Sequence, residues 1–293
     1  MNGIPLVTFG IPAYNRPALL AEALASIAAQ TERIEYEVIV TDDGDQPETA
    51  AVVARFPANR FRYHRNTPPL GAVQNWNEGL RRARGRWVMI LHEDDTLYPW
   101  YVAQVLPLLR DGLAAVCTKT IAGATMPHLP PPTSRSKACP YPAAWFLKSS
   151  MTPFPGVLFA RELALRLGGF DARMGPLADY DFWYRMARAA RIEVMPVVGA
   201  FYRIAEGQWT ERAWPEMLRK THLLRLRIAR EQIASRDSGR WLARFFTGRN
   251  ARAYANRFRE RPAALRRALR FTEISLGWLP SGWVWQALKM FAK

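Results

Sequence analysis

The chain has 293 residues, of which 49% are hydrophobic and 23% are charged, and it contains two cysteines. This composition is that of one large or two smaller folded domains, and it excludes a disordered or fibrous protein. Cys117 and Cys139 have neither paired spacing nor a nearby His cluster, which excludes a zinc module and indicates a reducing compartment. The formal charge of +16 calls for a polyanionic partner, which could be nucleic acid, an anionic membrane or a phosphorylated substrate.

Hydrophobic targeting segments are not evident in the sequence. The first residues contain no basic stretch followed by an apolar run, so we expect no secretory signal. No run of about 18 apolar residues without charge occurs, so a membrane-spanning helix is not expected. We therefore expect a cytoplasmic protein whose contact with the inner membrane is peripheral.

From residue 4 to about residue 120, short β-rich runs alternate with helical runs, which is typical of βαβ units and a parallel sheet. In the first helical run, residues 18–30, apolar Leu20, Leu24 and Ile27 recur at helical spacing after Pro17. We predict strands at residues 6–11, 36–41, 60–64 and 87–91, and an apolar run at 113–117. We predict further helices at residues 48–55, 72–83 and 100–110.

A proline-rich segment, residues 121–142, follows this half and predicts a loop, which we interpret as a mobile lid or a divider. Beyond it the pattern resumes. We predict strands at residues 156–159 and 192–197 and helices at 161–167 and 179–190. The predicted fold class is α/β, with a Rossmann-like, mostly parallel sheet flanked by helices.

The basic character of the chain belongs to its C-terminal part. Residues 211–293 contain 19 Lys and Arg against six Asp and Glu, so they carry +13 of the total +16. We predict helices at residues 214–235, 241–258 and 263–274. Aromatic residues follow them, at Trp278, Trp283, Trp285 and Phe291. Basic helices with aromatic residues favour the surface of an anionic membrane, while a helical bundle with a solvated Arg-rich face and nucleic-acid binding remain as alternatives.

Polar clusters follow three of the predicted strands, at residues 12–15, 41–45 and 92–95. In open α/β sheets such strand ends meet at the edge where ligands bind. The carboxylates gathered there would repel one another without a cation, and Mg²⁺ commonly joins one or two carboxylates to substrate phosphates. The clusters therefore predict a nucleoside diphosphate or triphosphate substrate.

The order and spacing of these motifs resemble glycosyltransferase family 2, whose members have the GT-A nucleotide-sugar fold. The resemblance covers about residues 4–100 and a second region that extends to about residue 204. The matching residues of the first region are Pro12, Tyr14, Asn15, Leu20, Ala23, Leu24, Ser26, Gln30, Asp42, Asp43, Gly44, Asn66, Gly71, Asn75, Trp76, Asn77, Gly79, Ala83, Gly85, Glu93, Asp94 and Asp95. Those of the second are Gly168, Gly169, Phe170, Asp171, Asp179, Tyr180, Asp181, Phe182, Trp183 and Arg185.

The resemblance implies a role for each site residue. Asp43 would bind uracil or a similar base, Pro12 and Tyr14 would frame the nucleotide pocket, and Asn15, Asn75 and Asp94 would also contact the nucleotide sugar. Asp94 and Asp95 would hold Mg²⁺ or Mn²⁺, one of them lying nearer the ribose. Asp179 would be the catalytic base that takes the proton of the acceptor hydroxyl, which implies inversion at the anomeric carbon.

The chain departs from the family pattern at three positions. His92 stands where the metal motif usually begins with aspartate, Ala178 replaces the glutamate that commonly precedes the base, and Ala205 replaces a histidine. Simpler explanations of the motif residues are a solvated turn at Asp43, helix capping at the 94–95 pair, and a favourable helix-dipole charge at Asp179. Asp181 is the alternative base.

We expect a catalytic domain at residues 1–210 and a basic amphipathic helical extension at 211–293. The expected activity is transfer of a single sugar from a nucleoside diphosphate sugar, with UDP favoured, to a hydroxyl of a glycan or lipid-linked acceptor. Bacterial surface polysaccharide assembly at the cytoplasmic membrane face is the expected setting, without nucleic acid as a partner. The alternatives are a nucleotidyltransferase-like enzyme and a non-catalytic basic adaptor that binds membrane or nucleic acid.

Overall fold

The computed structural model describes residues 4–133, 136–151, 153–205 and 209–257. The chain divides into two compact units, which are described separately. The first comprises residues up to 141 together with 151–205, and the second comprises residues 142–150 together with the chain after residue 205.

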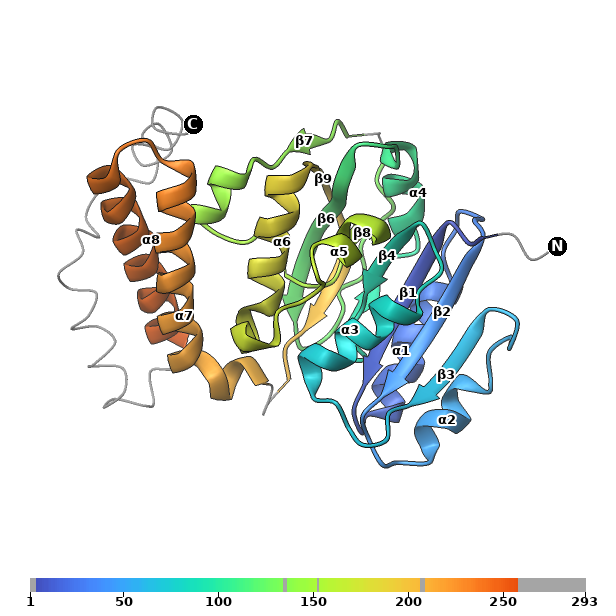
Figure 1. The fold of residues 1–293 in the computed structure, drawn as a ribbon. Coiled ribbons are helices and arrows are strands. Elements are labelled where there is room, and N and C mark those ends of the chain that lie inside the picture. Colours follow the sequence, from blue (N-terminus) through green and yellow to red (C-terminus); the bar gives the residue numbers. More distant parts are fainter. Residues whose placement is uncertain (1–3, 134–135, 152, 206–208, 258–293) are drawn as a thin grey trace. The chain divides into compact units, whose positions relative to one another are not determined.

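The first unit is built on a nine-stranded mixed sheet (Figure 1). Its main strand order is β3-β2-β1-β4-β8-β6-β9-β5, with β7 paired to β9. Within the run β3-β2-β1-β4 the strands are parallel to one another. Strand β8 is antiparallel to β4 and β6, and β6 is parallel to β9. The strands are β1 Val7–Ala13, β2 Tyr36–Asp42, β3 Phe61–Arg65, β4 Trp87–Ile90, β5 Thr96–Leu97, β6 Leu113–Gly123, β7 Cys139–Pro140, β8 Val157–Ala160 and β9 Arg191–Arg203.

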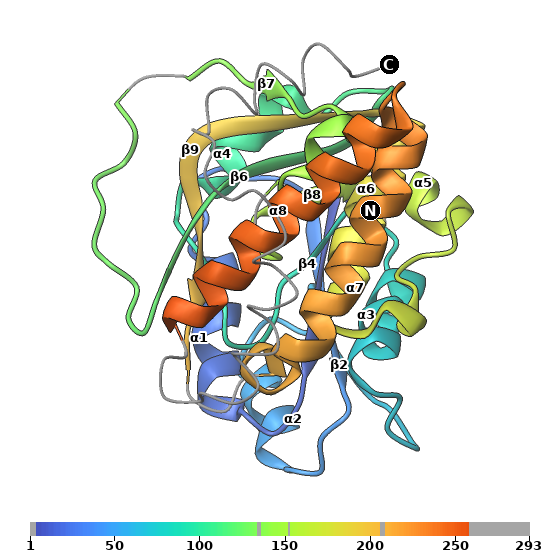
Figure 2. The ribbon, with the colours of Figure 1, turned by 90° about the vertical axis from the view of Figure 1, so that its left-hand side faces the viewer.

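Helices cover both faces of this sheet, with α1 and α4 on one side and α3 and α6 on the other (Figures 1 and 2). The helices of this unit are α1 Pro17–Ala28, α2 Glu48–Val53, α3 Ala72–Arg82, α4 Tyr101–Val105, α5 Arg161–Arg166 and α6 Ala178–Ala189. Short 3₁₀ helices occur at Leu106–Leu108 and Ala172–Leu177. This is the predicted α/β class of fold.

Side chains alternate between the two faces along β1, as a strand with both faces buried requires. Phe9 and Ile11 pack into the same core as Leu24 and Ile27 of α1. Gly10 faces Gly79 of α3: a Cβ atom on Gly10 would lie 3.7 Å from the Gly79 Cα atom and 2.9 Å from the side chain of Ile90 in β4. The absence of a side chain at this position lets α3 lie close to the sheet.

The predicted elements are found with shifted ends. The helix predicted at residues 100–110 ends as an α-helix at Val105 and continues as a 3₁₀ turn, because Pro107 cannot donate a backbone hydrogen bond. Strand β6 runs to Gly123, three residues into the segment predicted to be loop, and β9 runs to Arg203, beyond the predicted end at residue 197. The two strands extend because they pair with each other in parallel along this length.

The second unit contains a 3₁₀ helix, Ala143–Leu147, and two long helices, α7 Trp209–Gln232 and α8 Arg236–Arg257. Within this unit the fully buried Arg225 donates to the carbonyl of Lys148 at 2.7 Å, which fastens α7 to the segment after the 3₁₀ helix. None of the described helices is both long and apolar enough to cross a bilayer. The helix predicted at residues 263–274 and the four C-terminal aromatic residues lie outside the described residues.

Candidate functional site

The carboxyl ends of β1, β2 and β4 lie side by side at one edge of the sheet. Ala13, the last residue of β1, is the register partner of Asp42, the last residue of β2. The residue after β4, Leu91, donates its N–H to the carbonyl of Gly10 at 2.9 Å. The three polar clusters expected at the strand ends therefore begin from neighbouring positions.

The turn after β1 is fastened on two sides. The Tyr14 N–H donates to Glu93 Oε2 at 2.9 Å, which joins the turn to the end of β4. Asn15 has a positive φ of 60°, and its Oδ1 accepts from the N–H of Asp45 at 2.9 Å, which joins the turn to the end of β2. A Cβ atom on Gly44 would lie 2.3 Å from that same oxygen. Glycine at this position is what allows the two loops to approach.

Asp43 is buried and its carboxylate organises the loop after β3. Its Oδ1 accepts from Asn66 Nδ2 at 2.7 Å and from the Leu70 N–H at 3.0 Å, and its Oδ2 accepts from the Gly71 N–H at 2.7 Å. Gly71 has a positive φ of 82°, which a residue without a side chain adopts readily. A contact between Asp43 and a nucleotide base stays a prediction.

Asn75, on α3, is 2% exposed and joins three parts of the same edge. Its Nδ2 donates to the carbonyl of Thr41 at 2.9 Å, and its Oδ1 accepts from Asn66 Nδ2 at 3.0 Å. These bonds give Asn75 a supporting role behind Asp43, while its direct contact with a nucleotide stays a prediction. Of the other predicted nucleotide-binding residues, Tyr14 is exposed and Pro12 is half-buried at the end of β1.

Asp42 points away from these groups and pairs with β3. Its Oδ2 accepts from the Tyr63 hydroxyl at 2.8 Å, and its Oδ1 accepts from the Gly44 N–H at 2.8 Å. Burial, followed by the Asp42 carboxylate, raises the pKa of Tyr63 to about 12. Asp42 therefore holds the loop, which leaves Asp43 as the aspartate of this pair that faces the strand-end edge beside Asn75.

A possible metal centre lies directly after β4. One ligand atom from each of His92, Asp94 and Asp95 can be chosen so that the three lie within 4.8 Å of one another. Asp95 is fully buried: its Oδ1 accepts from the Arg203 N–H at 3.0 Å, and its Oδ2 has no hydrogen-bond partner among the described residues. Burial, and then the nearby Asp94, raise the pKa of Asp95 well above its usual range.

The residues present fit a divalent cation. A buried carboxylate oxygen without a partner is costly unless a cation joins it. His92 Nδ1 lies 3.9 Å from that oxygen, and burial lowers the pKa of His92, which favours the neutral imidazole that a metal requires. The two carboxylates suit either Mg²⁺ or Mn²⁺, and the imidazole favours Mn²⁺, since imidazole is a ligand of transition metals rather than of magnesium.

Two residues of this edge had no role assigned from the sequence. Arg16 Nη1 donates to Asp94 Oδ2 at 2.7 Å, so a guanidinium covers one oxygen of a predicted metal ligand. Glu93 is buried against Tyr14, and burial raises its pKa to about 7. The signal for both was position, since Glu93 lies inside the 92–95 cluster and Arg16 directly follows the 12–15 cluster. Only the side-chain directions show what they contact.

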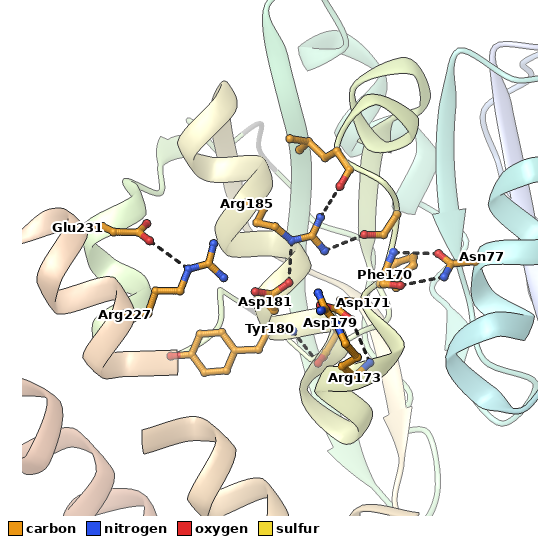
Figure 3. Close-up of polar contacts among 12 residues, drawn as sticks. Asn77, Phe170, Asp171, Arg173, Asp179, Tyr180, Asp181, Arg185, Arg227 and Glu231 are labelled. Atoms are coloured by element: carbon orange, nitrogen blue, oxygen red, sulfur yellow. Dashed lines mark hydrogen bonds and ion pairs between the residues drawn. The ribbon is translucent and has the colours of Figure 1, made fainter. Parts of the chain in front are cut away.

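Asp179 lies in the first turn of α6 and is half-buried. Its Oδ1 accepts from the Tyr180 N–H at 2.7 Å, and burial raises its pKa to about 6. The alternative base, Asp181, is 2% exposed and forms an ion pair with Arg185 (Figure 3). Arg185 also donates to the carbonyls of Leu167 and Gly169, so this pair holds the loop in front of α6.

Aromatic side chains connect α6 with the end of β4. Trp183 stands one helical turn after Asp179 on the same face of α6 and packs on Phe154, with ring centroids 5.9 Å apart. Phe154 in turn packs on His92 at 4.5 Å, and Trp76 of α3 packs on both. The aromatic residues therefore connect α6 and the possible metal centre in one packed cluster.

Comparison with known proteins places the chain in a large group of relatives. The model of the family "Glycosyl transferase family 2" matches residues 8–164. "Uncharacterized protein MT1568" of Mycobacterium tuberculosis is 29% identical over 208 residues, which are 66% of this chain and 65% of that protein. "Succinoglycan biosynthesis protein ExoO" of Rhizobium meliloti is 41% identical over 102 residues, which are 34% of this chain and 28% of that protein. The chain thus spans less than two thirds of the length of these relatives.

Solved structures show the same fold at low identity. Staphylococcus aureus TarS 1-349 in complex with UDP-GlcNAc superimposes with a TM-score of 0.68 and 17% identity, covering 96% of this chain and 81% of that one. The mannosyltransferase PcManGT from Pyrobaculum calidifontis, in complex with GDP-Man and Mn²⁺, gives a TM-score of 0.55 and 21% identity, covering 99% of this chain and 74% of that one. The first unit therefore has the predicted GT-A type of fold, and the family model matches more than half of the residues. The chain belongs to glycosyl transferase family 2.

Proposed function

We propose that the chain is an inverting, metal-dependent glycosyltransferase that moves one sugar from a nucleoside diphosphate sugar to a hydroxyl acceptor. The observation that carries this proposal is that Asp43 follows β2 and the group of His92, Asp94 and Asp95 follows β4, the two strands that flank β1 in a GT-A type sheet. Such an edge is where α/β sheets bind nucleotides. UDP is the favoured nucleotide, and the complexes of TarS with UDP-GlcNAc and UDP support it.

In this proposal each part of the site has one task. Asp43 and Asn66 shape the base pocket beside the exposed Tyr14. Asp94 and Asp95, with His92 beside them, would hold Mg²⁺ or Mn²⁺, which when bound stabilises the negative charge that grows on the leaving diphosphate. Asp179 accepts the proton of the acceptor hydroxyl as its oxygen attacks the anomeric carbon.

The state of Asp179 suits this task. Its pKa of about 6 keeps most of the carboxylate ionised at neutral pH, yet leaves it a stronger base than an ordinary aspartate. Ala178 is buried beside it and brings no second carboxylate. The other carboxylate of α6, Asp181, is paired with Arg185, so Asp179 has no second carboxylate of this helix acting beside it. This supports a direct displacement, and hence inversion.

The acceptor is proposed to be a glycan or a lipid-linked glycan in surface polysaccharide biosynthesis. The name of the relative ExoO, a succinoglycan biosynthesis protein, supports this class of product.

In the second unit, the exposed Arg236, Arg240 and Arg244 recur every four residues on α8 and so lie on one face. We expect this face to bind an anionic inner-membrane surface, as basic helices do.

The proposal is tested with a panel of nucleoside diphosphate sugars and the full chain, with thermal stability measured in the presence and absence of Mn²⁺. Ligands that bind only the folded state raise its stability by mass action. We expect one UDP-sugar to raise the Tm with Mn²⁺ and much less without it, and Asp95→Asn to lose the effect. Asp45→Asn, an exposed neighbour of the site, is the matched control. A panel in which no sugar nucleotide stabilises the chain refutes the proposal.

The membrane contact has its own test. Vesicles of anionic phosphatidylglycerol should sediment the wild-type chain, whereas zwitterionic phosphatidylcholine vesicles should not. Replacing Arg236, Arg240 and Arg244 together by Gln should weaken sedimentation, because each basic residue near such a surface contributes about 1 kcal/mol. The Arg33→Gln variant, at an exposed position in the first unit, should behave as wild type. Equal sedimentation of the triple variant and the wild type would remove this part of the proposal.

A further inference from the structure

Arg16 pairs with one oxygen of Asp94, a carboxylate assigned to the proposed metal centre. Its Nη1 lies 2.7 Å from Asp94 Oδ2, the distance of a strong, charge-assisted hydrogen bond. Asp94 and Asp95 are neighbours in the same turn. Among the described residues, Asp94 forms an ion pair with the Arg16 guanidinium, whereas Asp95 is approached by His92 and by the backbone N–H of Arg203. The charge of Asp94 is thus already compensated, while the buried Oδ2 of Asp95 has no hydrogen-bond partner among the described residues.

The backbone that carries Arg16 is held in place, so a change at this pair must come from the side chain. Tyr14 is bonded to Glu93, and Asn15 accepts from the N–H groups of the loop after β2. Arg16 itself precedes Pro17, the first residue of α1. These contacts fix the turn immediately before the guanidinium-bearing side chain.

The side chain, by contrast, lies at the boundary with solvent. The Arg16 side chain is 38% exposed, whereas that of Asp94 is 13% exposed. An arginine at such a position keeps much of its hydration and can exchange one anionic partner for another at small cost. A nucleoside diphosphate offers a better partner, because two phosphates can accept the planar guanidinium at two points.

A guanidinium and a divalent cation at the same carboxylate repel each other. A metal ion that enters alone must therefore displace Arg16 and leave it without an anionic partner. A metal ion that enters with a diphosphate displaces Arg16 onto the phosphates, where its charge is compensated. The two ligands consequently assist each other.

We propose that Arg16 is a binding residue that couples the metal to the donor: it covers Asp94 in the free protein and moves to the diphosphate when the nucleotide and the metal bind together. This inference rests on the proposed function, because it assumes a metal-dependent nucleotide site at this edge. It makes the site respond weakly to metal alone. Linkage requires that the metal raise the affinity for the nucleotide by the same factor by which the nucleotide raises the affinity for the metal.

Calorimetric titration of the full chain tests the coupling, with MnCl₂ alone, UDP alone and UDP in the presence of Mn²⁺. In Arg16→Ala we expect Mn²⁺ alone to bind about fivefold more tightly, because its competitor is gone. The same variant should bind UDP in the presence of Mn²⁺ about tenfold more weakly, because a charged contact to phosphate is lost. Opposite changes in the two affinities are the signature of the exchange, and a merely structural residue would not produce them.

Two further variants complete the design. Arg16→Lys keeps the charge but lacks the fork, so Mn²⁺ alone should bind as in wild type while the gain from UDP falls. Arg33→Ala, an exposed arginine after α1, should match the wild type in all three titrations. If Arg16→Ala binds Mn²⁺ alone no more tightly than wild type while wild type binds UDP with Mn²⁺, the role of Arg16 is refuted and the proposed function stands. If the wild type binds no UDP at any Mn²⁺ concentration, the proposed function itself fails.

Discussion

Asp181 and Arg185 form an ion pair one turn apart on α6, with Asp181 Oδ2 2.7 Å from Arg185 Nε. Arg185 extends this pair to the carbonyls of Leu167 and Gly169, in the loop that leads to Phe170 (Figure 3). Phe170 is held from the other side by Asn77, whose amide bonds both its N–H and its carbonyl at 2.8 Å. Asp181 is thus part of the support of the site, and Asp179 is the carboxylate of this helix turn proposed to act in transfer.

Substitution separates these two roles. Asp179→Asn should abolish sugar transfer and leave donor binding and stability close to wild type, because it removes only the proton acceptor. Asp181→Asn should lower the free energy of unfolding by about 2 kcal/mol, because it weakens a buried, charge-assisted hydrogen bond. Transfer assays, UDP titration and urea unfolding of both variants measure the difference. Normal turnover by Asp179→Asn would show that the base is assigned to the wrong residue.

The rate of transfer should depend on pH through Asp179. Because burial raises its pKa to about 6, the carboxylate is protonated and inactive as a base below this pH and ionised above it. The kcat at saturating donor and Mn²⁺ should therefore rise between pH 5 and about 7 and then level off. Glu93→Gln serves as the matched control, since the pKa of Glu93 is raised to about 7. If kcat no longer rises with pH in Glu93→Gln, the ionisation that controls the rate belongs to Glu93 and not to Asp179.

Asp43 should prove to be a determinant of both local stability and nucleotide binding. Its two oxygens accept three N–H groups, and an amide nitrogen in Asp43→Asn cannot accept any of them. We expect a loss of about 2 kcal/mol in the free energy of unfolding and a loss of UDP affinity of about tenfold or more. Asp45→Asn, two residues away and exposed, should change neither quantity. Unchanged UDP affinity in a destabilised Asp43→Asn chain would limit Asp43 to support of the loop.

His92 should set the metal preference of the site. With an imidazole beside two carboxylates, UDP binding should be supported better by Mn²⁺ than by Mg²⁺. His92→Asp supplies a hard oxygen ligand instead. We expect this variant to reduce the ratio of the UDP dissociation constant measured with Mg²⁺ to that measured with Mn²⁺ by about tenfold, or ~1.4 kcal/mol. The exposed His128→Asp is the control for the added charge. A ratio that is the same in His92→Asp and wild type would exclude His92 from the metal centre.

The sequence was sufficient to predict the α/β class, the parallel first half and the positions of the strand-end clusters. These features depend on local patterns: apolar alternation marks the strands of a buried sheet, and Gly, Asn and Asp mark the turns after them. Gly44 and Gly71 show why glycine indicates a turn in the sequence. Gly44 allows a close approach of two loops, and Gly71 has a backbone conformation that residues with a side chain rarely adopt. The ends of β6 and β9 were missed because each depends on pairing with a strand distant in sequence. The end of α4 at Val105 has a local cause, Pro107, which the prediction of a helix over residues 100–110 did not take into account.

Within the candidate site, the sequence by itself determined which chemical groups are available, because motif spacing fixes the residue types at each strand end. Only the tertiary structure decided how they are used. It turned Asp42 towards Tyr63 and Asp43 towards the loop at Gly71, and it paired Asp181 with Arg185. It also brought Arg16, 78 positions away along the chain, onto Asp94. Two neighbouring aspartates cannot be distinguished from the sequence, because their side chains are identical. Their roles differ because strand pairing and helix packing bring different hydrogen-bond donors to each carboxylate.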